Sequence, residues 1–198
     1  MKKLAQLEAR KLLRELEFLS SDLEYKQEVL SDADGRFLNS VNEFLSMNPE
    51  LKNAFDDVIN RRLDASIKRS QQILSDETAM EVDFVHKETD PKLKKIYWDI
   101  AKLTHPDKVG DTRLNELYLE AGKSYREEDI IGLYSVCEKV GIDYVVDEDD
   151  IASIRSQIEK TRGKIDLLQS TATWAWNYAE SEAGRQDIVV RYVGAQLR

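Results

Sequence analysis

The sequence predicts an all-α protein in which a hairpin of two short helices is flanked by long N- and C-terminal helices that form coiled coils. Charged residues make up 34% of the chain and hydrophobic residues 41%, with three prolines and eight glycines, a balance typical of helical proteins. Aliphatic residues near both ends recur at alternating steps of three and four, which indicates coiled-coil seams. Asn48-Pro49 and Asp90-Pro91 each place a capping residue before a proline, which predicts a helix start.

Residues 1–74 are expected to form an N-terminal helical region. A long helix is predicted over 2–31, a break with turn chemistry over 31–35, and a short helix over 36–47. A third helix begins at Pro49 and extends to about residue 74. The seam of the first helix consists of Leu12, Leu16, Leu19, Leu23 and Leu30, with Lys26 at the missing position, and the third helix is expected to bury Leu51, Phe55, Val58, Ile59, Leu63, Ile67 and Leu74.

Residues 75–90 are polar and irregular, and we interpret them as a linker to a second region over 91–146. Pro106 ends the helix predicted over 91–104, because proline has no amide hydrogen and forces the preceding residue out of helical geometry. Two further helices are expected over 112–125 and from about 127 to 140, where Gly141 stops the second. The helix over 91–104 has a core stripe of Leu93, Ile96, Tyr97, Ile100 and Leu103, and a polar stripe of Lys92, Lys95, Asp99 and Lys102.

Residues 147–198 are expected to form a long C-terminal helix. The acidic run over 147–150 opens it, since negative charge is favourable at the positive end of the helix dipole. The N- and C-terminal seams are natural partners within one chain, and pairing between subunits satisfies the same pattern. The C-terminal seam consists of Ile151, Ile154, Ile158, Thr161, Ile165, Leu168, Ala172, Ala175 and Ala179.

The most informative segment is Thr104-His105-Pro106-Asp107-Lys108, which directly follows a basic amphipathic helix. Proline fixes a sharp exit from the helix, so His105 and Asp107 are expected to project from a rigid loop. A carboxylate in that position is suited to a charge-assisted contact with an arginine. Two plainer interpretations stay open: Asp107 caps the next segment in an ordinary helix-ending turn, and the lysines form only a solvated face.

Residues 91–141 resemble a J-domain, the module with which co-chaperones activate the ATPase of DnaK-class heat-shock chaperones. In that family the second helix carries a tyrosine, an aliphatic residue and an alanine at fixed spacing before His-Pro-Asp, and this chain has Tyr97, Ile100 and Ala101 there. The resemblance implies a chaperone contact through His105, Pro106, Asp107, Lys92, Lys94, Lys95, Lys102 and Lys108. It also implies a J-domain core of Leu93, Ile96, Tyr97, Ile100, Ala101, Leu103, Leu114, Leu117, Tyr118 and Ala121.

The function implied by the resemblance is a co-chaperone in which Asp107 contacts an arginine near the ATPase domain and interdomain linker of a DnaK-class chaperone. The coiled-coil arms are then expected to bind a client protein or to form a homo-oligomer. Four features depart from the family: Trp98 replaces a usual basic residue, Thr104 replaces a frequent aromatic residue, the alanine-tyrosine pairing of the third helix fits only loosely, and the family's first helix is not recognisable over 75–89. Trp98 and the missing first helix favour an alternative, a structural or adaptor coiled-coil protein with an inactive J-like fold.

Composition and motifs argue against several other classes. The net charge of −9 argues against nucleic-acid binding, which needs clustered lysines and arginines. With one cysteine, no apolar signal-peptide core and no run of roughly twenty apolar residues, we expect a soluble, cytoplasmic protein without a membrane contact. We expect no enzyme, catalytic residue, cofactor or metal, because phosphate-loop, cysteine-pair and Ser-His-Asp patterns are missing and His86 has no partner at metal-ligand spacing. Cys137 is expected to be a small buried residue.

Overall fold

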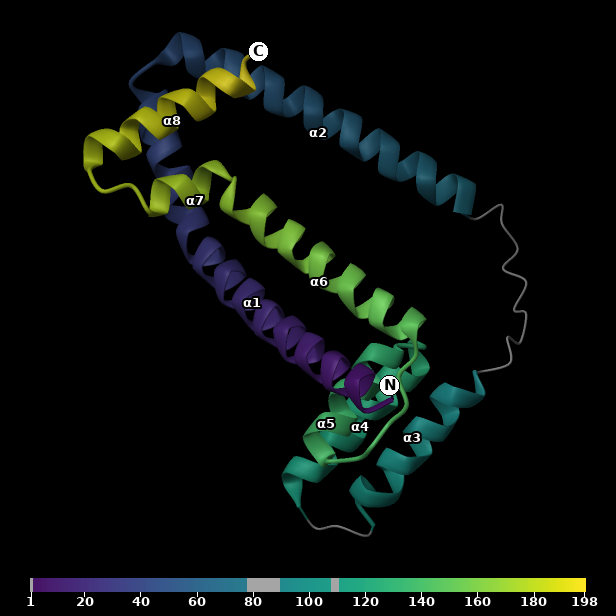
Figure 1. Cartoon of the computed structure of the whole chain (residues 1–198). Helices are drawn as coiled ribbons and strands as arrows, with labels where there is room; N and C mark the ends of the chain where they lie inside the picture. The colour runs from purple at the N-terminus through teal and green to yellow at the C-terminus, as the bar shows by residue number, and fades with distance from the viewer. Residues whose placement is uncertain (1, 78–89, 108–110) are drawn as a thin grey trace. The chain divides into compact units, whose positions relative to one another are not determined.

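The structure, a computed structural model, describes residues 2–77, 90–107 and 111–198, with the backbone alone at 2–3 and 71–77. All regular secondary structure in these ranges is α-helical, which confirms the all-α prediction (Figure 1). The helices are α1 (Lys2–Ser46), α2 (Pro49–Glu77), α3 (Pro91–Thr104), α4 (Thr112–Arg126), α5 (Ile130–Val140), α6 (Glu148–Gln169), α7 (Ala172–Asn177) and α8 (Glu182–Gln196).

The chain divides into two compact units, each assembled from segments that are distant in the sequence. The first unit contains residues 1–22 and 86–163, and the second contains residues 23–85 and 164–198. The expected segments 1–74 and 147–198 are therefore each shared between the units, whereas 91–146 lies wholly in the first. Of the expected linker over 75–90, residues 75–77 belong to α2 and residues 78–89 lie outside the described part of the chain.

The centre of the first unit is formed by α3, α4 and α5, with residues 9–19 of α1 and 151–158 of α6 packed against them. Burial of this apolar surface is the main source of stability for the hairpin of α3 and α4. The core includes Ile100 of α3, Leu117 and Ala121 of α4, Leu133, Tyr134, Val136 and Cys137 of α5, Ala9 of α1 and Ile154 of α6.

Side-chain caps fix where the helices of this unit begin. The carboxylates of Asp90, Asp111 and Asp129 accept hydrogen bonds from the backbone amides of Lys92, Arg113 and Gly132, at 2.8, 2.8 and 3.0 Å. Such caps satisfy amide donors that have no partner within the helix. At the other end of α5, Gly141 adopts the left-handed conformation with φ of +81°, as the sequence predicted for a helix stop.

Within the first unit, α1 and α6 run side by side in the same direction. Ion pairs join Glu8 to Arg155 and Glu15 to Arg162. The partners on each helix are seven residues apart, so the two helices keep heptad register over these turns. Leu13, Leu16, Ile154 and Ile158 belong to the same buried cluster. Of the predicted N-terminal seam, Leu16 is buried in this cluster and Leu12 and Leu19 are partly buried, whereas Leu13 holds a core position that the predicted seam did not include.

The second unit buries an aromatic cluster between α1, α7 and α8. Phe37 meets the rings of Trp176 and Tyr192 edge-on, with centroid distances of 5.9 and 5.1 Å. The guanidinium of Arg185 lies 5.3 Å from the centroid of the Trp176 ring. The same core also contains Val41, Leu45, Val189 and Val193.

The predicted break over 31–35 is wrong, because α1 continues through it to Ser46. Ala33 is fully buried, and the same helix face continues with Phe37, Val41 and Leu45. The other four residues of the segment are exposed. Turn-forming residues on the solvent side of a helix do not end it when its opposite face is buried against a core.

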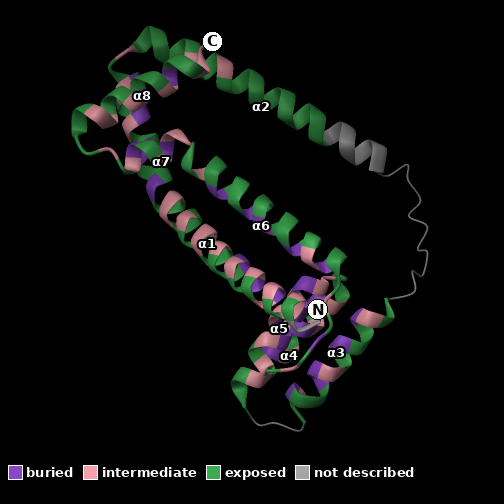
Figure 2. Ribbon diagram, viewed as in Figure 1, coloured by how far each residue is buried: buried purple, intermediate pink, exposed green. Residues whose placement is uncertain are grey.

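The expected burial along α2 is also wrong for most of the helix. Phe55 and Val58 are half-buried, and Phe55 packs against Tyr192 of α8 at 6.5 Å between ring centroids. The side chain of Leu74 lies outside the described residues. Figure 2 shows α2 as exposed over most of its described length, because α8 covers only a short part of it. The exposed members of the predicted stripe are Leu51, Ile59, Leu63 and Ile67.

The long C-terminal helix is corrected to three helices. α6 ends at Gln169, and Thr171 caps α7 by accepting a hydrogen bond from the Trp174 amide at 3.2 Å. Ser181 caps α8 in the same way through the amide of Gly184. The alanine end of the seam does not form a buried stripe, and Ala175 is exposed. Capping hydroxyls offset the loss of helical hydrogen bonds at the breaks.

Two smaller corrections concern the first unit. Leu103 is 52% exposed, and Thr104 takes its place in the core because four-residue steps from Ile96 and Ile100 lead to it. The Thr104 hydroxyl donates to the carbonyl of Ile100 at 2.9 Å, which satisfies the buried polar group. α5 begins at Ile130 and not near residue 127, since Asp129 is its cap.

We predict that Ile158→Asp lowers the free energy of unfolding by more than about 3 kcal/mol, because Ile158 is 3% exposed and a carboxylate there is buried without a partner. Urea unfolding followed by circular dichroism measures the change. Ser156→Asp, at an exposed position of the same helix, is the matched control and is expected to change stability by less than about 0.5 kcal/mol. Equal stability of the two variants would contradict the buried seam.

Candidate functional site

The His-Pro-Asp segment forms a corner at the end of α3. The amide of His105 donates the last helical hydrogen bond, to the carbonyl of Ala101 at 3.0 Å. His105 itself has left the helix, with φ of −59° and ψ of 128°, the extended geometry that a following proline requires. The chain therefore turns sharply at Pro106, which is exposed.

Beyond the corner, His105 and Asp107 are held against each other but remain accessible. The amide of Asp107 donates to Nδ1 of His105 at 3.2 Å, and an Asp107 carboxylate oxygen lies 3.7 Å from the same nitrogen. The Asp107 side chain is 86% exposed and that of His105 is 39% exposed. Since Asp111 is the cap of α4, the interpretation of Asp107 as a helix cap does not describe this loop.

Two aromatic contacts between α3 and α4 hold the corner in place. The imidazole of His105 meets the Tyr118 ring edge-on, with 5.2 Å between centroids. About two turns further along the hairpin, Tyr97 stacks on Tyr125 with centroids 4.6 Å apart and ring planes 18° apart. A hydrogen bond with Tyr118, together with burial, raises the pKa of Tyr97. The corner is thus fixed to α4 through His105, and the Tyr97–Tyr125 stack fixes the hairpin behind it.

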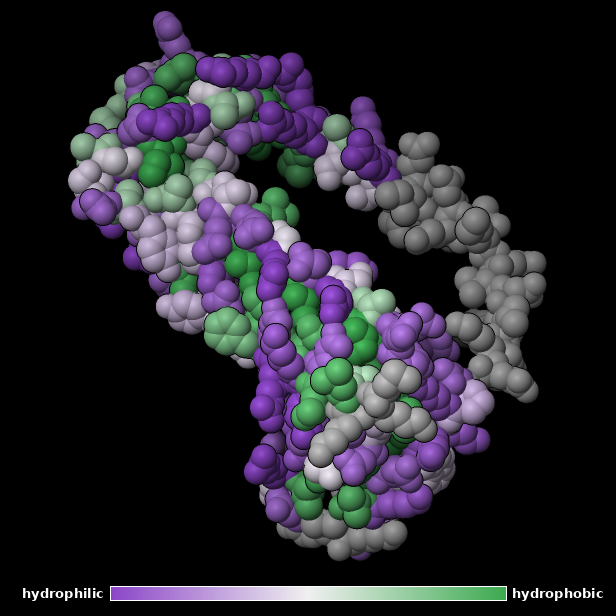
Figure 3. Space-filling model, viewed as in Figure 1, coloured by the Kyte–Doolittle hydropathy of each residue, from purple (hydrophilic) through white to green (hydrophobic). Residues whose placement is uncertain are grey.

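The lysines predicted to form one basic face have different surroundings. Lys94 and Lys95 are exposed, and Lys102 is exposed while pairing with Asp99 at 2.8 Å. Lys108 lies outside the described residues. The surface over α3 is mainly hydrophilic (Figure 3). A surface pair such as that of Lys102 contributes little stability, so Lys102 stays able to contact another molecule.

Lys92 belongs to an internal ion-pair network and not to the exposed basic face. Its ammonium lies 2.6 Å from Asp147 and 2.5 Å from Asp150 at the start of α6. The Asp150 carboxylate, whose side chain is 9% exposed, also accepts a hydrogen bond from the Tyr134 hydroxyl at 2.8 Å. The network joins α3, α5 and α6 in the first unit.

Asp147 and Asp150 cap α6 reciprocally. The amide of Asp150 donates to the Asp147 carboxylate, and the amide of Asp147 donates to the Asp150 carboxylate, both at 2.9 Å. This is the capping-box arrangement, with aspartates at both positions. The acidic helix start was predicted from the sequence but the network was not, although the three-residue spacing of the two aspartates is a capping-box signal.

Charge and burial shift the pKa values within this network. Burial works to lower the pKa of Lys92, but its hydrogen bonds to Asp147 and Asp150 outweigh burial and raise that pKa. The hydrogen bond from Lys92, with a second from the Asp150 amide, lowers the pKa of Asp147. Burial raises the pKa of Tyr134. At neutral pH Lys92 is therefore positively charged and Tyr134 keeps its hydroxyl proton.

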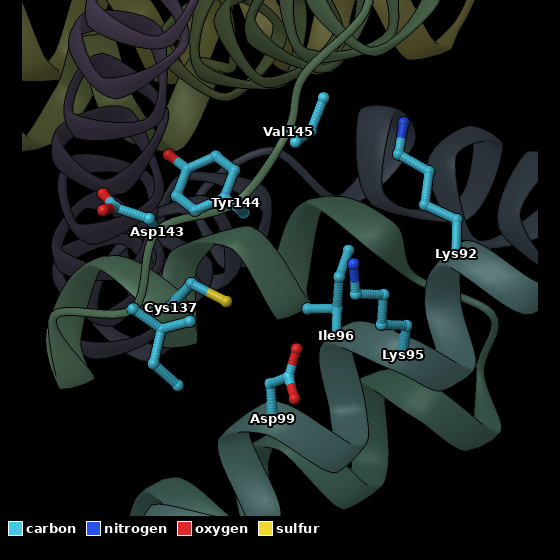
Figure 4. A pocket seen from close by; sticks show the side chains of 9 residues that line it. Lys92, Lys95, Ile96, Asp99, Cys137, Asp143, Tyr144 and Val145 are labelled. Carbon is cyan, nitrogen blue, oxygen red and sulfur yellow. The ribbon is translucent and has the colours of Figure 1, made fainter.

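A hollow of about 160 Å³ lies between α3, α5 and the segment over 142–145 (Figure 4). Lys95 and Asp99 line one side, and Tyr144 and Val145 line another. Cys137 also lines it, and burial raises the pKa of its thiol to about 12, so the thiol is protonated at neutral pH. The hollow is smaller than the roughly 300 Å³ of ordinary ligand pockets. Cys137 is a buried core residue, as predicted.

Comparisons with family models, curated proteins and solved structures find no match to this chain. Within the described residues, no group of acidic, histidine and cysteine side chains has the geometry to hold a metal ion. No helix in the same part of the chain is long and apolar enough to cross a membrane.

We predict that Lys92→Met lowers the free energy of unfolding by about 2–3 kcal/mol at pH 7, because it leaves the Asp150 carboxylate buried without its cation. Lys95→Met, three residues along α3 at an exposed position, is the matched control and is expected to have little effect. Urea titrations of both variants measure the difference.

The pH dependence of this difference follows from Asp147. The pKa of Asp147 is lower in the folded state than its usual 3.8. The stability that ionised Asp147 contributes is therefore complete above pH 3.8 and is lost as the pH falls through the folded-state pKa. The stability gap between the parent chain and Lys92→Met is therefore expected to narrow below pH 3.8. A constant gap across that range would show that Asp147 does not interact with Lys92.

Proposed function

We propose that this chain is a J-domain co-chaperone that stimulates the ATPase of a DnaK-class heat-shock chaperone. The observation that carries the proposal is the exposed Asp107 carboxylate, held on a proline-fixed corner at the end of a basic helix. The hairpin of α3 and α4, with its tyrosine contacts, supplies a rigid base for that corner. The family resemblance of residues 91–141 assigns the same segment to chaperone contact.

The corner is suited to changing a partner's equilibrium without chemistry of its own. A carboxylate that is 86% exposed can accept two parallel hydrogen bonds from an arginine. If that arginine is available only in the hydrolysing state of the chaperone, binding of Asp107 shifts the population toward that state. His105 contributes by orienting Asp107 through the 3.2 Å hydrogen bond to its amide.

Lys94, Lys95 and Lys102 supply the exposed positive charge beside the corner. They steer α3 toward an acidic surface, which increases the association rate more than the affinity. Lys92 is excluded from this role because its charge is engaged with Asp147 and Asp150. The proposed contact therefore comprises the corner and the three other lysines.

The remaining parts of the chain are proposed to choose the client or the oligomeric state. The exposed aliphatic residues of α2 in the second unit offer an apolar helix face for that purpose. One buried cysteine suits a reducing compartment, and we place the protein in the cytoplasm on that ground.

The alternative is a structural or adaptor protein with an inactive J-like hairpin. The sequestration of Lys92 favours it, since it removes one charge from the basic helix. Trp98, in place of a usual basic residue, also favours it. Pull-downs in which a DnaK-class chaperone never appears, while another protein binds residues 150–198, would select this alternative.

We predict that the full chain stimulates ATP turnover by a purified DnaK-class chaperone and that Asp107→Asn reduces the stimulation at least tenfold. The amide keeps the shape of the side chain but removes the charge that strengthens a hydrogen bond to arginine, a loss of about 1.5–3 kcal/mol. Steady-state phosphate release measures the turnover. Glu116→Gln, which neutralises an exposed carboxylate on α4, is the matched control. Unchanged stimulation by Asp107→Asn would remove Asp107 from the site.

A further inference from the structure

Trp98 is a large apolar side chain that the fold leaves on the outer surface of α3. It is 55% exposed, and its contact with the Tyr97 ring is edge-on with 6.1 Å between centroids. The other two tryptophans differ, since Trp176 is buried and Trp174 is half-buried. Trp98 belongs neither to the buried cluster of the first unit nor to the side chains that pack against that cluster.

Three lysines surround Trp98 on the helix surface. Lys94, Lys95 and Lys102 lie four and three residues before it and four residues after it, which are the neighbouring positions on an α-helix. All three are exposed. We call Lys94, Lys95, Trp98 and Lys102 the outer face of α3. An aromatic side chain flanked by cations on its helix favours a partner surface that is acidic at its rim and apolar at its centre.

The outer face is continuous with the His-Pro-Asp corner. His105 follows Trp98 by seven residues, two helical turns, so both start from the same side of α3 and are about 10 Å apart along the axis. A single partner surface can therefore contact Trp98, Lys102 and the corner together. Standard protein interfaces are several times wider than this separation.

We propose that Trp98 is the apolar anchor of the partner contact, inserted into a recess of an acidic protein surface while the three lysines contact the acidic rim. This inference rests on the proposed function and deepens it. Trp98 supplies affinity for the chaperone, and Asp107 shifts the chaperone toward its hydrolysing state. Tryptophan is among the residues whose truncation costs most at protein interfaces.

A protein partner is favoured over a nucleic acid by the charges on this surface. Asp99 pairs with Lys102 at 2.8 Å, and the Asp107 carboxylate projects into solvent at the end of the same helix. Phosphates are repelled by both aspartates and by the net charge of −9, whereas an acidic protein surface with its own arginine satisfies the lysines and Asp107 together.

The test compares full-length variants in ATPase titrations with purified bacterial DnaK and with a eukaryotic cytosolic homologue. Trp98→Ala is expected to raise the concentration for half-maximal stimulation roughly 30-fold while leaving the maximal stimulation unchanged. Trp98→Lys is expected to weaken binding similarly, because added charge does not fill an apolar recess. Leu119→Ala, which truncates a 62% exposed apolar side chain on α4, is the control and is expected to behave like the parent chain. Thermal melting checks that all variants fold.

The outcomes separate this inference from the proposed function. Suppose that Asp107→Asn loses stimulation but Trp98→Ala keeps the half-maximal concentration of the parent chain. The proposed co-chaperone function would then stand, and the role of Trp98 as an anchor would be overturned. Binding by Trp98→Lys as tight as that of the parent chain would also overturn it, since lysine charge alone would then explain the contact. Absence of stimulation by the parent chain overturns both. Single-stranded nucleic-acid binding that Trp98→Ala abolishes would assign the face to another ligand.

Discussion

The arrangement of the first unit depends on one buried carboxylate, Asp150. It accepts hydrogen bonds from the Lys92 ammonium, the Tyr134 hydroxyl and the Asp147 amide, so three helices meet at one charged group. All three donors bind the same oxygen, Oδ2, and they offset the cost of burying the charge there. The network fixes the start of α3 relative to α5 and α6, and hence which side of α3 faces outward.

That orientation decides which charges of α3 can act on a partner. Lys92 and Lys95 are three residues apart and look equivalent in the sequence, yet the first is committed to Asp150 and the second is exposed. The free cationic surface is therefore narrower than the sequence suggests, and Trp98 lies within it. A narrow basic surface with an aromatic centre favours selectivity for one partner over general attraction to acidic proteins.

Local chemistry predicted the starts of α2 and α3, because prolines and caps act over a few residues, as at Asp90 and Pro91. The breaks were harder to predict. Gly35 lies in a segment that resembles a turn but stays helical, since Ala33 beside it is buried, whereas the seam through Leu168 appears continuous but is interrupted where Thr171 caps α7. The apolar stripe of α2 was expected to be buried, but a stripe in the sequence does not show whether another helix is available to cover it. At the site, the corner was predictable from Pro106, but the role of Lys92 required knowledge of residues 55 and 58 positions away.

The rigidity of the His-Pro-Asp corner explains how a contact of a few residues can change the conformational equilibrium of a partner. A flexible loop loses conformational entropy when it binds, and this loss reduces the binding free energy available to favour one state of the partner. Here Pro106 fixes the backbone, His105 is held against Tyr118, and the Asp107 amide is bound to the imidazole. The backbone at Asp107 is thus fixed before it meets a partner, while the carboxylate remains exposed. If Trp98 supplies the affinity, the full interaction energy of Asp107 is available to distinguish the two states of the chaperone, and that differential energy alone shifts a population.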